Sequence, residues 1–263
     1  MSKYVNKFKR SARVAKKKDI IIYLVLRIIV VLIFLRCLYL GYFENAILSL
    51  ITLFLLFMPL FIQKRFKITI PGILEIMIYI FIFSSTILGE VYQFYVYFPY
   101  FDMIIHAING FLCASLGFYI AEILNHHDKG FKLAPLYMAI FAFCFSITLG
   151  VIWEFCEFSL DKKFNTDHQK DTLITSFSST LLDESKNSKP VIIKDIYETI
   201  ILNDDDDILA TIKGGYIDIG LKDTMDDLKV TFLGAGVYAY ICYYYLKKRD
   251  KKNLTSNFII ENN

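Results

Sequence analysis

The stretch "LAPLYMAIFAFCFSITLGVIWEFCE" at residues 133–157 decides the fold class. It contains no charged side chain before Glu154. A helix of about 20 apolar residues crosses the hydrocarbon core of a bilayer, which is roughly 30 Å thick. The stretch therefore predicts a transmembrane helix whose end carries two carboxylates, Glu154 and Glu157.

Working outward, similar apolar blocks recur along the chain. The 263 residues are 56% hydrophobic, whereas soluble domains are about 45–50% apolar. The mean hydropathy is +0.46. The sequence predicts an all-α fold, a polytopic membrane helix bundle with six transmembrane helices at 19–40, 45–62, 70–89, 102–124, 133–157 and 227–246.

Basic residues occupy every second connection between these blocks, and the other connections lack them. Positive charge marks the cytoplasmic side of a membrane protein. We therefore predict a multi-pass protein of the cell membrane with cytoplasmic N- and C-termini. The basic segments are "KFKRSARVAKKK" (7–18), "QKRFK" (63–67), "HHDKGFK" (126–132) and "KKRDKK" (247–252).

The predicted organisation has four parts. Residues 1–158 hold the basic N-terminus and five spans, 159–222 form one long extracytoplasmic loop, 223–246 form the sixth span, and 247–263 form a cytoplasmic tail. Residues 159–226 contain eight lysines and fourteen acidic residues, and this negative balance agrees with an outer location. The apolar residues of 190–202 have helical spacing and predict a helix on the membrane surface.

The four aspartates at 204–207 raise the question of a calcium loop. The segment lacks the glycine and the terminal glutamate of an EF-hand loop. We expect a solvated acidic turn.

Polar residues gather at the predicted outer ends of the spans. Asp102 and His106 share a helical face by their spacing of four, and Thr231 and Gly234 continue the face of Asp227. Ionisable residues at such depths normally face a bundle interior. The predicted shared site contains Asp102, His106, Glu154 and Asp227, with Glu90, Glu157, Asp223 and Thr231 around it.

The helix dipole offers an alternative explanation for some of these acids. A carboxylate in the first helical turn is stabilised by the dipole, which accounts for Asp102 and Asp223. The dipole does not account for Glu154, at a helix C-terminus, or for His106, one turn inside. These two residues are the most informative members of the predicted site.

Several carboxylates at low dielectric need compensation by protons, a cation or a basic side chain. Arg36, near the outer end of the first span, either reaches into the site or snorkels to the headgroups. A divalent metal is the other candidate, because carboxylates with one imidazole suit zinc, manganese or iron. The candidate metal ligands are Asp102, His106, Glu154 and Asp227, and the candidate catalytic residues are His106, Glu154 and Asp227.

Four motifs together resemble a known family. They are "GE" at 89–90, "FDMIIHAINGF" at 101–111, "GVIWEFCEF" at 150–158 and "GGYIDIGLKDTMDDLKVTFLGA" at 214–235. The chain resembles the YjdF-type bacterial membrane proteins, which are similar in pattern to the VanZ-like proteins named for teicoplanin resistance. The resemblance implies a multi-pass bundle with a polar outer site. Thr231 stands where the VanZ-like pattern has Asn.

Three classes of function stay open. The first is a metal-assisted or acid/base enzyme acting on an envelope, cell-wall or lipid-linked substrate. The second is a structural or accessory membrane protein without catalysis. The third is an ion-coupled transporter, although transporter sites usually lie at the midplane on broken helices. The lipid bilayer is the expected surrounding partner, and no nucleic-acid partner is predicted.

Overall fold

The computed structural model describes residues 2–66, 68–127, 133–247 and 261–262. Two compact units are present. The first combines Met1–Gly150 with Asp227–Asn263, and the second is Val151–Asp226. Parts of three predicted basic segments, at 67, 128–132 and 248–252, lie outside the described residues.

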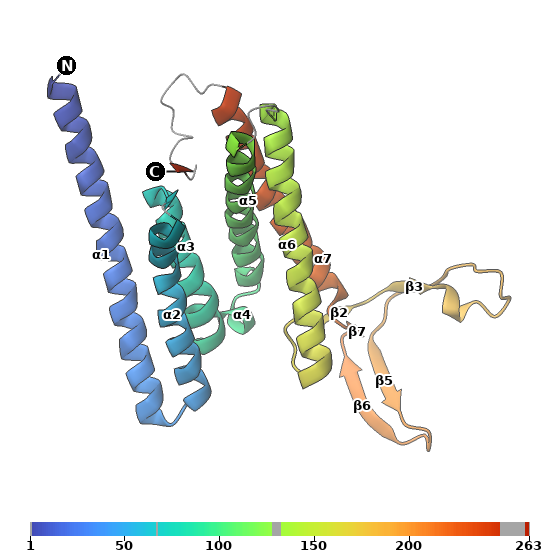
Figure 1. The fold of residues 1–263 in the computed structure, drawn as a ribbon. Coiled ribbons are helices and arrows are strands. Elements are labelled where there is room, and N and C mark those ends of the chain that lie inside the picture. The colour runs from blue at the N-terminus through green and yellow to red at the C-terminus, as the bar shows by residue number, and fades with distance from the viewer. Residues whose placement is uncertain (1, 67, 128–132, 248–260, 263) are drawn as a thin grey trace. The chain divides into compact units, whose positions relative to one another are not determined.

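Helices dominate the chain (Figure 1). Each of the six predicted apolar blocks is helical, so the all-α, membrane-type fold class is confirmed. The third block is an α-helix that continues as a π-helix, η1. The helical elements are α1 (Ser2–Leu40), α2 (Phe43–Phe66), α3 (Gly72–Phe83), η1 (Ser84–Val91), α4 (Phe94–Tyr97), α5 (Phe101–His127), α6 (Pro135–Phe164) and α7 (Leu221–Lys247).

Among the described residues, five helical segments are long and apolar enough to cross a membrane: Ile21–Leu40, Phe43–Phe66, Gly72–Val91, Phe101–Asn125 and Pro135–Phe164. Helix α7, predicted as the sixth span, is not among these five. Its first two turns are charged and its second half is rich in tyrosine, which lowers its hydropathy.

Large apolar side chains are exposed on the outside of the helices. On α1, Ile28 and Leu32 are 59% and 60% exposed, and on α2 Phe54 is 63% exposed. Extended apolar surfaces of this kind are typical of contact with a membrane. The protein is a membrane protein embedded in the lipid bilayer.

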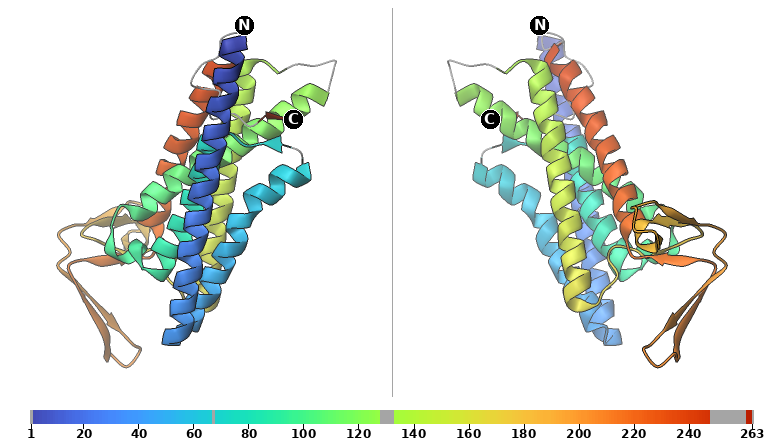
Figure 2. Two further views of the ribbon diagram at one scale, coloured as in Figure 1. Left: turned by 90° about the vertical axis from the view of Figure 1, so that its left-hand side faces the viewer. Right: turned by 90° about the vertical axis from the view of Figure 1, so that its right-hand side faces the viewer.

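The helices of the first unit pack around two apolar clusters. One cluster joins α1, α2, α3 and η1 and contains the fully buried Val30 and Leu56. The other joins α3, α5, the first part of α6, and α7, and contains Phe118 and Tyr238. The Phe111 and Tyr238 rings of α5 and α7 meet edge to face with centroids 5.0 Å apart. In both views of Figure 2, α2 and α5 are inclined to α1.

The connection from η1 to α5 sets where α5 begins. In the π-helix, the Tyr92 N–H donates to the Ile87 carbonyl at 3.0 Å. Gln93 then adopts a left-handed conformation, with φ of 57°, and turns the chain into the short helix α4. Helix α5 starts at Phe101, which places Asp102 in its first turn.

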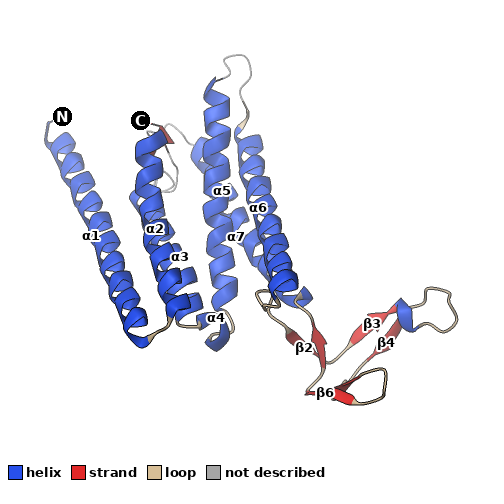
Figure 3. Ribbon diagram, turned by 60° about the horizontal axis from the view of Figure 1, so that its bottom comes forward, coloured by secondary structure: helices blue, strands red, loops and turns tan. Residues whose placement is uncertain are grey.

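The second unit contains short antiparallel strand pairs between α6 and α7 (Figure 3). β2 (Thr172–Ile174) pairs with β7 (Tyr216–Asp218), β3 (Phe177–Ser179) with β4 (Val191–Ile193), and β5 (Glu198–Leu202) with β6 (Ile208–Lys213). A 3-10 helix, η2 (Thr180–Leu182), follows β3. In the first unit, β1 (Ile68–Thr69) pairs with β8 (Glu261–Asn262).

The sequence-based prediction of a surface helix at 190–202 is wrong. This segment contains the strands β4 and β5 instead. Its valine, isoleucine and threonine residues are β-branched and favour a pleated strand over a helix. The predicted loop also starts later and ends earlier, because α6 continues to Phe164 and α7 begins at Leu221.

The acidic segment 204–207 is a turn, as predicted. It joins β5 to β6, and the Asn203 N–H donates to the Asp207 carbonyl at 3.1 Å. The Asn203 side-chain oxygen accepts from the N–H groups of Asp205 and Asp207. The four aspartates are exposed. The turn is therefore held by asparagine, with no need for a cation.

Candidate functional site

Glycines let α5 and α7 approach closely. A Cβ built on Gly234 would overlap the Ala107 carbonyl oxygen and lie 3.1 Å from the Phe111 nitrogen. A Cβ on Gly110 would overlap the Thr231 carbonyl oxygen in the same way. Small residues at helix crossings are typical of membrane helices, because they allow backbones into contact. This contact fixes the register of α5 against α7.

The close crossing brings three ionisable side chains together. His106 lies one turn from Gly110, and Asp227 lies two turns from Gly234. The Nε2 atom of His106 is 3.5 Å from Oδ1 of Asp102 and 3.6 Å from Oδ2 of Asp227. One ligand atom from each residue lies within 4.8 Å of the others. All three residues belong to the first unit.

The triad of Asp102, His106 and Asp227 is largely shielded from solvent. Side-chain exposure is 20% for Asp102, 8% for His106 and 2% for Asp227. Two carboxylates at such burial repel each other strongly unless positive charge lies between them. A protonated imidazole, a bound cation or a proton on one of the carboxylates would relieve that repulsion.

The triad spacing fits a divalent cation. In a tetrahedral site with bonds of about 2.1 Å, ligand atoms lie about 3.4 Å apart. The two measured separations, 3.5 and 3.6 Å, need only a small contraction to reach this value. One imidazole and two carboxylates form a mixed nitrogen and oxygen donor set that suits zinc, manganese or iron. Three protein ligands leave a position for water or substrate.

Two hydroxyl groups near the triad form hydrogen bonds between neighbouring helices. The Thr231 hydroxyl donates to the His106 carbonyl at 3.4 Å. The buried Ser146 hydroxyl of α6 donates to the Gly110 carbonyl at 2.7 Å. The sequence predicts Thr231 near the site. In the structure its hydroxyl hydrogen-bonds to the backbone of His106.

Three predicted site residues lie in the second unit. Glu154 is buried, and the Gln169 side-chain amide lies 3.5 Å from its carboxylate. Glu157 accepts a hydrogen bond from the Trp153 indole at 2.8 Å. Asp223 accepts from the Lys170 backbone N–H at 2.8 Å. The inclusion of Glu154 in the metal site stays a prediction.

Two predicted residues lie on the protein surface. Glu90 is exposed on η1, and Arg36 is exposed on α1. Among the residues that the structure describes, Arg36 forms no ion pair. An exposed arginine near a helix end favours snorkelling to the headgroups over compensation of the buried carboxylates.

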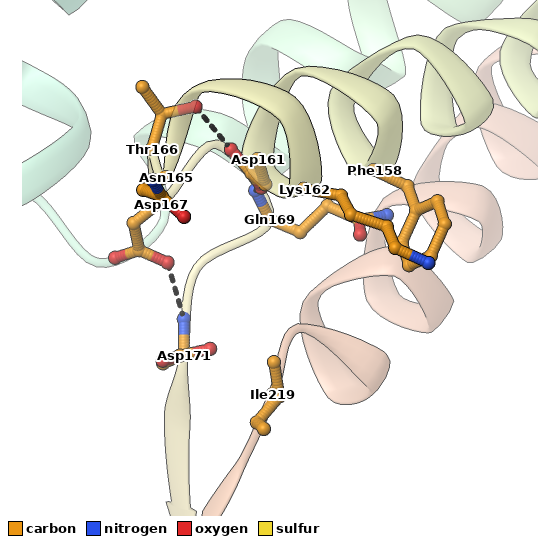
Figure 4. A pocket seen from close by; sticks show the side chains of 9 residues that line it. All are labelled: Phe158, Asp161, Lys162, Asn165, Thr166, Asp167, Gln169, Asp171 and Ile219. Carbon is orange, nitrogen blue, oxygen red and sulfur yellow. Dashed lines mark hydrogen bonds between the residues drawn. The ribbon is translucent and has the colours of Figure 1, made fainter.

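A separate pocket of about 550 Å³ lies within the second unit (Figure 4). Asp161, Asp167 and Asp171 line it. Burial and then neighbouring carboxylates, first of them Asp167, raise the pKa of Asp171. The Asp161 carboxylate is already engaged by the backbone N–H groups of His168 and Gln169. We assign these acids to holding the loop after α6.

Sequence reasoning missed the residues that organise this loop. His168 lies 2.9 Å from Asp161 through its Nδ1 atom. The Gln169 amide donates to the Thr224 hydroxyl at 2.6 Å. His168 lies beyond the end of α6, so helical spacing does not relate it to Asp161, and 55 residues separate Gln169 from Thr224. No spacing signal could have indicated them.

Comparison with known proteins identifies the family. Residues 21–248 match the family described as "Predicted membrane protein (DUF2238)". No curated protein and no solved structure matches the chain. The resemblance to YjdF-type proteins is confirmed, because these form the same family. The wider relation to VanZ-like proteins stays a prediction. The chain belongs to the DUF2238 family of membrane proteins.

Proposed function

We propose that this membrane protein binds a divalent cation through Asp102, His106 and Asp227. The observation that carries the proposal is the convergence of three potential ligands, two of them buried, from two separate helices, with ligand atoms within 4.8 Å. A cation relieves the repulsion between the two carboxylates and orients the imidazole. Zinc, manganese or iron is the metal class that the donor set favours.

The proposed chemistry is metal-assisted or acid/base catalysis on an envelope or lipid-linked substrate. Asp102 is the most exposed of the three side chains, so a substrate would approach from its side. A bound cation would polarise a substrate oxygen or activate water. The chain's own residues would hold the cation, and the Thr231 hydroxyl ties the backbone of α5 at His106 to α7.

The proposed topology has six spans with both termini in the cytoplasm. The positive-inside pattern of the sequence supports it, and α7 supplies the sixth helix with a length of 27 residues. This topology places Asp102 at the extracytoplasmic end of α5. A reporter fused after Asn263 should be active in the cytoplasm. A reporter inserted at 204–207 should be active outside.

An accessory role is the second candidate. The Thr231 hydrogen bond and the glycine contacts show that the triad region also ties α5 to α7. A transport path between α5 and α7 is disfavoured, because the backbones of these two helices are in contact at Gly110 and Gly234.

The test of catalysis uses purified protein in liposomes. It is incubated with a total lipid extract that contains envelope precursors, and products are followed by mass spectrometry. We expect a mass change that disappears with a chelator and in His106→Ala. His168→Ala serves as the matched control, because that histidine lies in the second unit. If the lipid masses are unchanged by wild-type protein that holds metal, the enzyme proposal is wrong and the accessory role is favoured.

A further inference from the structure

Helix α1 carries a charged side chain inside its apolar span. Arg27 lies within the segment Ile21–Leu40 and is partly buried. Its Nη1 atom donates to the Tyr23 hydroxyl at 2.7 Å, and its guanidinium carbon lies 5.3 Å from the centroid of the same ring. Tyr23 precedes Arg27 by about one helical turn. The arginine side chain is therefore held toward the N-terminal end of α1.

The charge of Arg27 is not neutralised by the described part of the chain. Among the residues that the structure describes, Arg27 forms no ion pair. The Glu75 carboxylate of α3 accepts instead from the Tyr79 hydroxyl at 2.8 Å and from the Gln63 amide at 3.3 Å. A guanidinium offers five N–H donors, and in this structure Tyr23 accepts from Nη1. A charge of this kind in an apolar span needs acceptors from outside the chain.

The guanidinium lies at the level where lipid headgroups begin. Tyr23 is two residues after Ile21, the start of the apolar segment, and at a rise of 1.5 Å per residue the two levels differ by about 3 Å. Long basic side chains near the ends of spans place their charge at this boundary. The Tyr23 ring also packs against the Tyr79 ring of α3, with centroids 5.1 Å apart. Arg27 therefore presents its charge beside the contact between α1 and α3.

We propose that Arg27 binds the phosphate of an anionic lipid beside the contact between α1 and α3. The planar guanidinium matches pairs of phosphate oxygens, and such charge-assisted hydrogen bonds are about twice as strong as neutral ones. In the topology proposed above, this lipid belongs to the inner leaflet, where anionic headgroups attract basic segments. The inference goes beyond the proposed metal site and does not depend on it.

Neighbouring charge favours an anionic headgroup over a zwitterionic one. Lys64 and Arg65 are exposed at the end of α2. Gln63, the residue before them, joins that end of α2 to Glu75 of α3, so these basic residues belong to the same end of the bundle as Arg27. Positive charge at this end attracts an anionic lipid and repels the ammonium group of a choline headgroup.

Exposed apolar side chains favour a lipid over free phosphate. Leu24 and Ile28, which flank Arg27 along α1, are 49% and 59% exposed. They offer the acyl chains of a lipid an apolar surface that inorganic phosphate cannot use. A basic group with apolar neighbours thus matches both parts of a lipid molecule.

Lipid retention by the full chain tests the proposal. Protein purified in detergent is mixed with phosphatidylglycerol or with phosphatidylcholine, and the bound lipid is counted by native mass spectrometry. We expect phosphatidylglycerol to be retained at least several-fold more than phosphatidylcholine, and Arg27→Gln to lose this preference. Arg36→Gln is the matched control, since it removes the other arginine of the same span, and it should keep the preference.

A further variant separates orientation from charge. Tyr23→Phe keeps the ring and the arginine but removes the hydroxyl that holds the guanidinium, and we expect retention to fall several-fold at unchanged Tm. Unchanged retention in Arg27→Gln, or an equal loss in Arg27→Gln and Arg36→Gln, would overturn the proposal. Displacement of the lipid by excess inorganic phosphate, but not by potassium chloride of equal ionic strength, would overturn it too, because a free anion would then be the ligand. The reporter fusions test the leaflet independently.

Discussion

Adding a single methyl group to α7 at Gly234 should push this helix away from α5. In Gly234→Ala, the new Cβ would lie 2.9 Å from the Ala107 carbonyl carbon and 3.1 Å from the Phe111 nitrogen, and it would overlap the Ala107 oxygen. Ordinary contacts are 3.4–4 Å. All three partners are backbone atoms, so the helices must move apart by about 1 Å to restore contact distances.

This movement has two measurable consequences. Overpacking of this kind costs about 1–3 kcal/mol, and a loss of about 2 kcal/mol lowers the Tm by about 4–8 °C in a protein of this size. The same shift would lengthen the Nε2–Oδ2 separation between His106 and Asp227, which is already 3.6 Å. Metal affinity should therefore fall together with stability.

Gly236→Ala is the matched control. It makes the same change on the same helix, and nothing lies within 4 Å of the position that its new Cβ would take. Alanine is the better helix former by about 0.5–1 kcal/mol, so the Tm should stay constant or rise. Thermal unfolding in detergent, followed by size-exclusion chromatography of the heated samples, measures both variants. Equal Tm values for the two variants would refute the close crossing of α5 and α7.

Three further predictions concern single hydrogen bonds. Ser146→Ala removes the 2.7 Å bond to the Gly110 carbonyl, and we expect a loss of about 1 kcal/mol, measured as a lower Tm; an unchanged Tm would contradict the contact. Thr231→Val keeps the side-chain shape but removes the donor to the His106 carbonyl, and we expect weaker metal binding at nearly unchanged Tm, measured by metal titration; unchanged affinity would rule out the positioning role. Hydrogen bonds from its loop, first from Ser185, lower the pKa of Asp183 below its ordinary value of 3.8. Because the folded pKa is depressed, the ionised form supports the loop at neutral pH, and this support is lost as the pH falls through the folded pKa. Amide hydrogen exchange in that loop, corrected for its intrinsic pH dependence, should accelerate on acidification in the wild type and be pH-insensitive in Asp183→Asn; identical profiles would contradict the assignment.

The helices could be predicted from the sequence because long apolar blocks leave few alternatives. A run such as 133–157 satisfies its backbone hydrogen bonds in lipid only as a helix. The predicted blocks 102–124 and 227–246 lie inside α5 and α7. The strands at 190–202 escaped prediction because short apolar runs fit both periods, and only partner strands decide between them.

The core of the site could also be predicted, for a different reason. Asp102 and His106 are one turn apart, and a buried histidine within an apolar block has few stable surroundings. Helical spacing does not say which face of α7 meets α5, and that depends on the contact at Gly234. Arg36 shows the limit of such reasoning. The sequence predicts the depth of Arg36 in the membrane, but its exposure on α1 depends on which face of that helix packs inward.

The claim that Asp102, His106 and Asp227 form a metal site is tested most directly by metal content. Purified wild-type protein in nanodiscs should hold about one zinc, manganese or iron ion per chain, measured by mass spectrometry of the elements. Asp227→Asn and His106→Gln preserve side-chain size and should lose most of that metal, while His168→Gln should retain it. Equal metal content in all four proteins, or none in the wild type after growth with each metal, would contradict the account.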